Sequence, residues 1–112
     1  MELSENEVQN SILDLLSYQG IKAWRNNSIS PFDKASQKYR RKSKWDINGV
    51  PDILGILPDG KFLGIEVKKD SSSKPSPDQK NFIMEAVGLN AVVFVAWNNS
   101  QVREALKDYF KR

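Results

Sequence analysis

The 112-residue chain is predicted to adopt an α/β fold with a mixed central sheet flanked by helices. Short apolar runs of strand length alternate with stretches in which apolar residues recur at helical spacing, in the order α-β-β-β-α-β-α. Two of the helical stretches begin with capping-box sequences, and two of the apolar runs are joined by a short turn. The length suits a single core, so residues 1–112 are expected to form one domain.

The first helix and the segment after it are delimited by local signals. A capping box from Ser4 to Glu7 opens the helix, and Gly20 is expected to end it. Residues 21–25 favour a short strand. Residues 26–48 are polar and basic with little periodicity, which predicts a long loop.

The middle of the chain predicts a β-hairpin. Its two apolar runs, residues 49–57 and 61–68, are joined by Pro-Asp-Gly at residues 58–60. Proline favours the second position of a type I turn, and glycine supplies the left-handed residue of a three-residue loop. If Leu57 lies opposite Lys61, the register of every other pair in the hairpin follows.

That register places Asp52 directly opposite Glu66. Opposed like charges are destabilising, and a divalent cation would turn the repulsion into coordination, because Mg²⁺ and Mn²⁺ prefer oxygen ligands. Lys68 follows Glu66 by two residues and therefore shares its face. The alternative, an exposed hairpin with a surface Glu–Lys pair, is disfavoured because both faces of these strands are otherwise apolar and such charges are costly to bury unpaired.

The last third of the chain predicts a helix, a strand and a final helix. Ser76, Pro77 and Gln79 occupy the N-cap, N1 and N3 positions of the first of these, which Gly88 or Asn90 ends. Residues 91–97 are nearly all apolar and favour a buried central strand. Ser100 can cap the last helix, whose Tyr109 and Phe110 serve equally well as core or as dimer contacts. The tryptophans of the predicted strands, Trp24 and Trp97, are expected in the core.

Composition excludes several classes of chemistry. With no cysteine and no histidine, the chain cannot use thiolates, an imidazole base or a Ser-His-Asp triad. Catalysis must therefore rely on carboxylates, Lys, Tyr or a metal-bound water. No run approaches the ~20 apolar residues of a membrane span and the start is not a signal peptide, so a cytoplasmic protein without a membrane partner is expected. The net charge of +3 leans towards an anionic partner.

Three motifs together resemble a known family. Gly49-Val-Pro-Asp52 closing onto Glu66-Val-Lys68, followed by Ser76-Pro-Asp-Gln79, resembles the VRR-NUC branch of the PD-(D/E)XK nuclease superfamily, in the stand-alone form of phages and bacteria. The resemblance runs from about Glu5 to Trp97. It implies a restriction-endonuclease-like core, an endodeoxyribonuclease that needs Mg²⁺ or Mn²⁺ and no small-molecule cofactor, and a bacterial or phage-infected cell as its setting.

The resemblance also implies roles for individual residues. Asp52, Glu66 and the main-chain carbonyl of Val67 would bind the metal. The family's acidic residue on the first helix would be Glu7, or Glu5 if the alignment shifts.

Two further residues would assist the reaction. By the same resemblance, Lys68 would orient or polarise the attacking water and offset charge on the transition state. Gln79 would position the lysine or the scissile phosphate. On sequence grounds alone, both Gln79 and Glu7 are equally well explained as N3 residues of capping boxes.

A basic segment precedes Asp52 and is a candidate DNA-binding region. Its cations would neutralise phosphates, and its aromatic rings could stack on unpaired bases. The alternative is a solubilising loop whose tryptophan packs into the core. The expected contacts are Lys38, Tyr39, Arg40, Arg41, Lys42, Lys44 and Trp45.

The expected activity is structure-selective cleavage of branched DNA, as in resolvases of four-way (Holliday) junctions. Such enzymes act as homodimers because two symmetric nicks need two sites. The resemblance implies 5′-phosphate and 3′-hydroxyl ends. The alternatives are a flap, nicking or restriction-type endonuclease of the same fold, and a nucleic-acid-binding module without catalysis.

Overall fold

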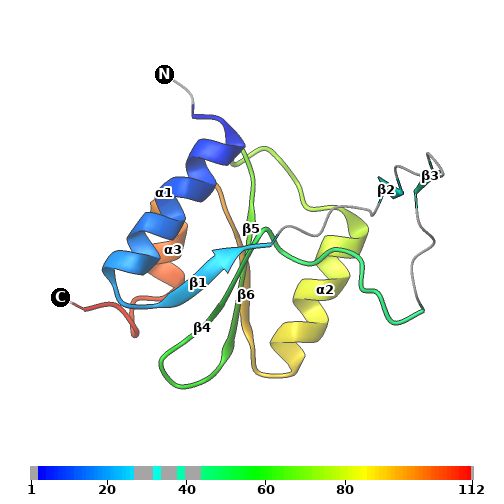
Figure 1. Cartoon of the computed structure of the whole chain (residues 1–112). Coiled ribbons are helices and arrows are strands. Elements are labelled where there is room, and N and C mark those ends of the chain that lie inside the picture. Colours follow the sequence, from blue (N-terminus) through cyan, green and yellow to red (C-terminus); the bar gives the residue numbers. More distant parts are fainter. Residues whose placement is uncertain (1–2, 27–31, 34–37, 40–43, 112) are drawn as a thin grey trace.

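A computed structural model describes residues 3–26, 32–33, 38–39 and 44–111. Within these ranges a four-stranded mixed sheet lies between two helices on one face, α1 and α3, and one helix on the other, α2 (Figure 1). The predicted α/β class and the order of the main elements are confirmed. The elements are α1 (Glu5–Tyr18), β1 (Lys22–Arg25), β2 (Phe32–Asp33), β3 (Lys38–Tyr39), β4 (Ile53–Ile56), β5 (Phe62–Val67), α2 (Pro77–Gly88), β6 (Val92–Ala96) and α3 (Asn99–Ala105).

The capping box of α1 is present as predicted. The Glu7 amide donates to Ser4 Oγ and the Ser4 amide donates to Glu7 Oε1, both at 3.1 Å. Gly20 follows the C-cap Gln19 with φ of +73°, a conformation that glycine adopts without a steric cost. One stripe of α1 is buried against the sheet and consists of Val8, Ile12, Leu15 and Leu16.

The hairpin register is also confirmed. Ile53 lies opposite Ile65 and Ile56 opposite Phe62, and the Leu57 amide donates to the Lys61 carbonyl at 2.9 Å. The two central strands, β4 and β5, are antiparallel, whereas β6 runs parallel to β5. The hairpin therefore carries the sequence motifs to one end of the sheet.

The expectation of a central strand at residues 91–97 is wrong in its position. The sheet order is β1-β4-β5-β6, so β6 is an edge strand of the described sheet. The β6 segment is apolar because α2 and α3 both pack on it, one on each face of the sheet. Covering both faces produces a continuous apolar run at an edge as readily as at the centre.

The two faces of the sheet are covered unequally. The core lies between the sheet and the α1–α3 side, where Ile53, Leu63 and Ile65 are fully buried. On the α2 side, Ile56 is 50% exposed and Trp24 43% exposed, contrary to the predicted burial of both hairpin faces and of this tryptophan. The reason is that α2 packs on β6 and leaves the β4–β1 half of this face open.

The segment predicted as a long loop contains a small second sheet. Strands β2 and β3 pair antiparallel, with Phe32 opposite Tyr39 and Asp33 opposite Lys38. Strands of two residues are too short to show the periodicity by which a strand is recognised in a sequence, so no local signal predicted them.

The last helix begins earlier and ends sooner than predicted. Asn98, not Ser100, is the N-cap, and Asn98 Oδ1 accepts from the Ser100 amide at 2.8 Å. Tyr109 and Phe110 follow the helix and pack against the core, which favours the first of their two sequence-based interpretations. No helix in the described ranges has the length and apolar character needed to cross a membrane.

Candidate active site

The β4–β5 hairpin brings two carboxylates to one end of the sheet. Asp52 immediately precedes β4, and Glu66 is the penultimate residue of β5, so the antiparallel register carries both to the same end. Asp52 Oδ2 accepts a hydrogen bond from the Val67 amide at 2.8 Å, which fixes its orientation. The Asp52 carbonyl accepts from the Asn26 amide at 2.7 Å and ties this end of β4 to β1.

Glu66 is a buried carboxylate with an unsatisfied oxygen. It is 3% exposed, and its Oε2 has no hydrogen-bond partner. Burial, together with the neighbouring Asp52 carboxylate, raises the pKa of Glu66 to about 8. A buried acceptor without a donor is costly, and a cation would satisfy it.

Lys68 lies between Glu66 and Gln79. Its Nζ is 3.9 Å from Glu66 Oε1 and donates to Gln79 Oε1 at 3.1 Å. The same Gln79 oxygen accepts from the Ser76 amide at 2.8 Å, within the capping box of α2. The cap and the site are thus compatible roles of one glutamine side chain, and the start of α2 fixes the position of the lysine.

A polar cleft opens beside these residues. Its volume is about 320 Å³, and Asp52 and Gln79 lie in its wall. Gly49, at φ of +78°, passes so close to α2 that a Cβ there would lie 2.3 Å from the Asp78 carbonyl oxygen. This close approach explains the glycine of the Gly-Val-Pro-Asp motif and holds the loop before β4 against the start of α2. The lining residues are Asn26, Ile47, Asn48, Gly49, Val50, Asp52, Ser76, Asp78 and Gln79.

Asn26 belongs to this site and was not predicted. Its Nδ2 donates to the Pro51 carbonyl at 3.1 Å, in addition to the bond from its amide to Asp52. The only sequence signal is a polar residue directly after a strand, which is too common to identify a functional residue.

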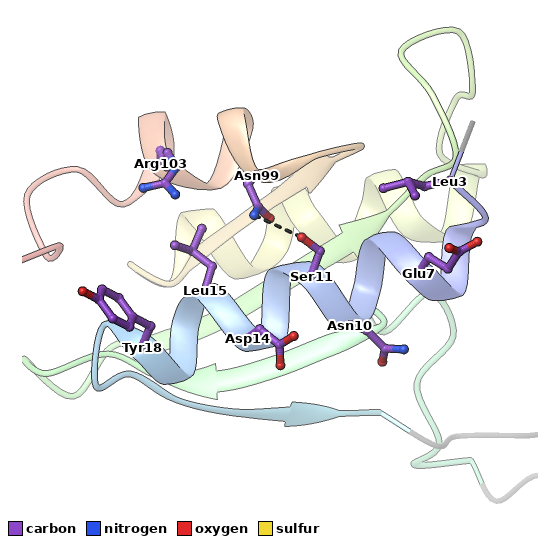
Figure 2. Close-up of a pocket in the computed structure, with 9 residues that line it drawn as sticks. All are labelled: Leu3, Glu7, Asn10, Ser11, Asp14, Leu15, Tyr18, Asn99 and Arg103. Carbon is purple, nitrogen blue, oxygen red and sulfur yellow. Dashed lines mark hydrogen bonds between the residues drawn. The ribbon is translucent and has the colours of Figure 1, made fainter. Parts of the chain in front are cut away.

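The structure does not bring Glu7 to the carboxylate pair. Its side chain is bound in the α1 cap, where the Ser4 hydrogen bonds lower the pKa of Glu7. It also lines a groove of about 700 Å³ along α1 and α3, together with Asn10, Asp14 and Arg103 (Figure 2). Glu5, by contrast, lies near enough to Glu66 that its negative charge contributes to the raised pKa of Glu66.

The donors of the site suit a hard cation. Asp52 and Glu66 offer carboxylate oxygens, and the unsatisfied Glu66 Oε2 points to a missing positive partner. Among the described residues, no group of three acidic, histidine or cysteine side chains is close enough to hold a metal ion. The assignments of the Val67 carbonyl and of a carboxylate on α1 therefore stay predictions.

The predicted basic segment lies only partly within the described residues. Arg40, Arg41 and Lys42 are outside them, and the backbone of Lys38 and Tyr39 forms β3. The alternative in which the tryptophan packs into the core is wrong, because Trp45 is 79% exposed. The Lys44 Nζ lies 5.1 Å from the centroid of its ring, a cation–π contact.

The fold is similar to that of two solved structures, whereas no family model and no curated protein matches the chain. A structure described as "VRR_NUC domain" is 28% identical over 95% of this chain and 97% of its own, with a TM-score of 0.66. A second, "VRR_NUC domain protein", is 22% identical over 97% of this chain and 89% of its own, with a TM-score of 0.65. Both neighbours fit a PD-(D/E)XK-like fold.

Proposed function

Because the chain belongs to the VRR-NUC family, we propose that it is an endodeoxyribonuclease that hydrolyses phosphodiester bonds with Mg²⁺ or Mn²⁺. The observation that carries the proposal is the pairing of Asp52 with the buried Glu66, whose Oε2 lacks a partner, beside Lys68. Residues 1–112 would form one nuclease domain, and it would act in the cytoplasm of a bacterial or phage-infected cell.

The metal would be held by Asp52, Glu66, the Val67 carbonyl and a carboxylate of α1. When bound, a divalent ion would lower the pKa of a water molecule and offset the charge of the phosphate. The residues of the chain prepare this position. The Val67 amide orients Asp52, and the buried strand β5 holds the Glu66 carboxylate with one oxygen that has no hydrogen-bond partner.

For the α1 ligand we favour Glu5 over Glu7. Glu7 Oε1 already accepts the Ser4 amide, and its side chain lies with the residues of the α1–α3 groove. Glu5 lies two residues before Glu7 on α1, and its charge interacts with that of Glu66 on β5. The Glu5 side chain would have to move towards Glu66 to complete a three-carboxylate site, since the described residues contain no such group.

Lys68 and Gln79 would act on the phosphate side of the site. The lysine side chain is held between Glu66 and Gln79. In the proposed reaction its ammonium would offset the charge that develops on a pentacovalent phosphorus. Gln79 is a positioning residue in this scheme. It fixes the lysine through the oxygen that also caps α2.

Contacts to DNA outside the catalytic centre would include Lys44 and Trp45. The exposed Trp45 ring can stack on an unpaired base, and the lysine keeps positive charge beside it. The remaining predicted contacts are Lys38, Tyr39, Arg40, Arg41 and Lys42.

We further propose that the substrate is branched DNA and that the enzyme is a homodimer. The support on this chain is an apolar surface on the α2 side of the sheet, which we call the open-face patch. Ile56 and Phe62 are cross-strand neighbours in it, and the Phe62 ring lies 6.4 Å from that of Phe82 on α2. Exposed apolar side chains of the patch are Trp24, Ile47, Ile56, Phe62 and Leu89.

The experiment is cleavage of a labelled four-way junction, a matched linear duplex and a flap, each in Mg²⁺, in Mn²⁺ and in chelator. We expect paired symmetric cuts in the junction that need metal and are lost in Asp52→Asn and Lys68→Ala. The matched controls are Asp108→Asn and Lys69→Ala, which alter exposed side chains of the same types.

Other outcomes are equally informative. Metal-dependent cutting of the flap or the duplex instead would keep the nuclease and reject the resolvase. DNA binding that is equal in chelator and in Mn²⁺, without cleavage of any substrate, would indicate a binding module and reject the catalytic proposal.

A further inference from the structure

Arg25, the last residue of β1, is held by two asparagines of α1. Its Nη1 donates to Asn6 Oδ1, and its Nη2 donates to Asn10 Oδ1. The two asparagines are four residues apart and therefore lie next to each other on one face of the helix. The guanidinium is thus fixed in position and orientation before any ligand binds.

The side-chain partners of Arg25 are neutral, and no carboxylate among the described residues forms an ion pair with it. The ion pairs among the described residues are Lys68–Glu66 and Lys107–Glu104, and neither involves Arg25. A guanidinium has five N–H donors, and the two asparagines account for one on each of two nitrogens. The Arg25 guanidinium is oriented and charged, and it has N–H donors that the asparagines do not use. Such a group can bind both oxygens of an oxyanion at once.

The position of Arg25 relative to the site is set by the sheet. Arg25 pairs with Ile53, the residue after Asp52, and partners in antiparallel strands have Cα atoms roughly 4.5–5.5 Å apart. The next residue, Asn26, binds the Asp52 carbonyl and lines the cleft. On the helix side, Asn6 directly follows Glu5. Arg25 itself does not line the cleft: its side chain lies on the α1 side of β1, between the start of α1 and the end of the sheet that carries Asp52.

We propose that Arg25 binds a backbone phosphate of a nucleic acid whose neighbouring phosphates lie at the Asp52–Glu66 end of the sheet, and that Asn6 and Asn10 are positioning residues for it. The inference rests on the proposed function only in taking a nucleic acid as the ligand. The alternative is a purely structural clasp that holds the edge strand β1 against α1. The two differ in whether removing the charge changes the salt dependence of DNA binding.

The test measures the affinity for a fluorescent four-way junction in chelator at several salt concentrations. For Arg25→Gln we expect the affinity to fall about tenfold. The plot of log affinity against log salt should become less steep by ~0.9, the change expected for the loss of one phosphate contact. Lys107→Gln, an exposed cation beyond the end of α3, is the matched control and should lose less. Arg25→Lys should keep the slope but lose part of the affinity, because an ammonium cannot bind in a bidentate manner.

The result that overturns the proposal is an unchanged affinity and slope for Arg25→Gln with only its thermal stability reduced. Should that variant not fold, an Asn6→Ala/Asn10→Ala double variant decides the matter. It keeps the charge, and we expect a several-fold loss of affinity, whereas an unchanged affinity would reject the proposal. Because binding is measured without cleavage, wild-type protein that binds but never cuts would refute the nuclease and leave this inference standing.

Discussion

Glu66 is a buried carboxylate whose oxygens are only partly satisfied by the surrounding protein groups. Its neighbours are apolar strand residues, a second carboxylate, and one lysine ammonium at 3.9 Å. The pKa of about 8 expresses this imbalance, because burial and then Asp52 favour the protonated form. A divalent cation bound at the proposed site would therefore compete with a proton for the same oxygen atoms.

The first prediction concerns stability against pH without metal. The pKa of Glu66 rises from 4.5 to about 8 on folding, so the folded state binds more protons and stability falls as pH rises through this window. Glu66→Gln removes the ionisation. Its melting temperature in chelator should be close to that of the wild type near pH 5 and exceed it by roughly 15 °C at pH 9. Differential scanning fluorimetry measures this, and a pH-independent difference would contradict it.

The second prediction separates the two candidate ligands on α1. Glu5→Gln should lower the cleavage rate at least ~100-fold at fixed Mn²⁺, because a ligand of the metal is lost. Glu7→Gln preserves the capping box, since glutamine also serves at N3, and should leave the rate within about threefold of wild type. Single-turnover cleavage with a Mn²⁺ titration measures both. An inactive Glu7→Gln variant and an active Glu5→Gln variant would show that Glu7, the first choice from the sequence, is the metal ligand on α1.

At the level of elements, the start of α2 links a helix cap to the lysine of the proposed site. Ser76 and Gln79 satisfy each other's amides, and the same glutamine oxygen holds Lys68. The third prediction follows from this division of roles. Ser76→Ala should cost about 1 kcal/mol of unfolding free energy with little change in cleavage. Gln79→Ala should cost a similar free energy and also lower kcat about tenfold.

Urea unfolding and single-turnover cleavage, measured on both variants, separate the two roles. Gln79→Glu retains a capping acceptor and is the matched control for the helix. Equal activity of Ser76→Ala and Gln79→Ala would show that the contact with Lys68 does not matter for the reaction.

Elements defined by local signals could be predicted from the sequence, and those defined by tertiary packing could not. Capping residues and turn residues act on their own neighbours, so the start of α1 and the register of the β4–β5 hairpin were predicted correctly. The exposure of Trp24 depends on how far α2 extends over the sheet, which no local pattern encodes. Arg25 was missed for the same reason, because its partners lie 15 and 19 residues away.

For the whole molecule, the unequal covering of the sheet leaves the open-face patch. Two aromatic rings, about 40% exposed, and three exposed aliphatic side chains present on the order of 400 Å² of apolar surface, given 150–250 Å² for a whole aromatic side chain. That is about half of the ~800 Å² each partner contributes to a standard interface, and polar rims normally supply the rest. Lys22 pairs with Ile56, and Glu85 lies beside Leu89 in the groove next to Phe62. In a two-fold dimer, Lys22 of each copy can meet Glu85 of the other.

The last prediction tests this surface as the dimer interface of the proposed resolvase. Ile56 lies at the turn end of β4, away from Asp52, so Ile56→Asp should disrupt association without altering the site. A buried aspartate at a two-fold interface faces its own copy and has no cation to pair with. We expect a monomer by light scattering, at concentrations where the wild type is a dimer, that nicks one strand of a junction instead of making paired cuts.

Charge exchange provides the sharper form of this test. Lys22→Glu and Glu85→Lys should each weaken the dimer, because each places like charges together across the two-fold axis, and the double variant should restore it. Met84→Asp is the matched control for Ile56→Asp, since Met84 is exposed but follows Phe82 by two residues and so points away from the patch. A dimer that survives Ile56→Asp would place the interface elsewhere. Paired cutting by a monomeric Ile56→Asp variant would instead refute the argument that two symmetric nicks need two copies of this site.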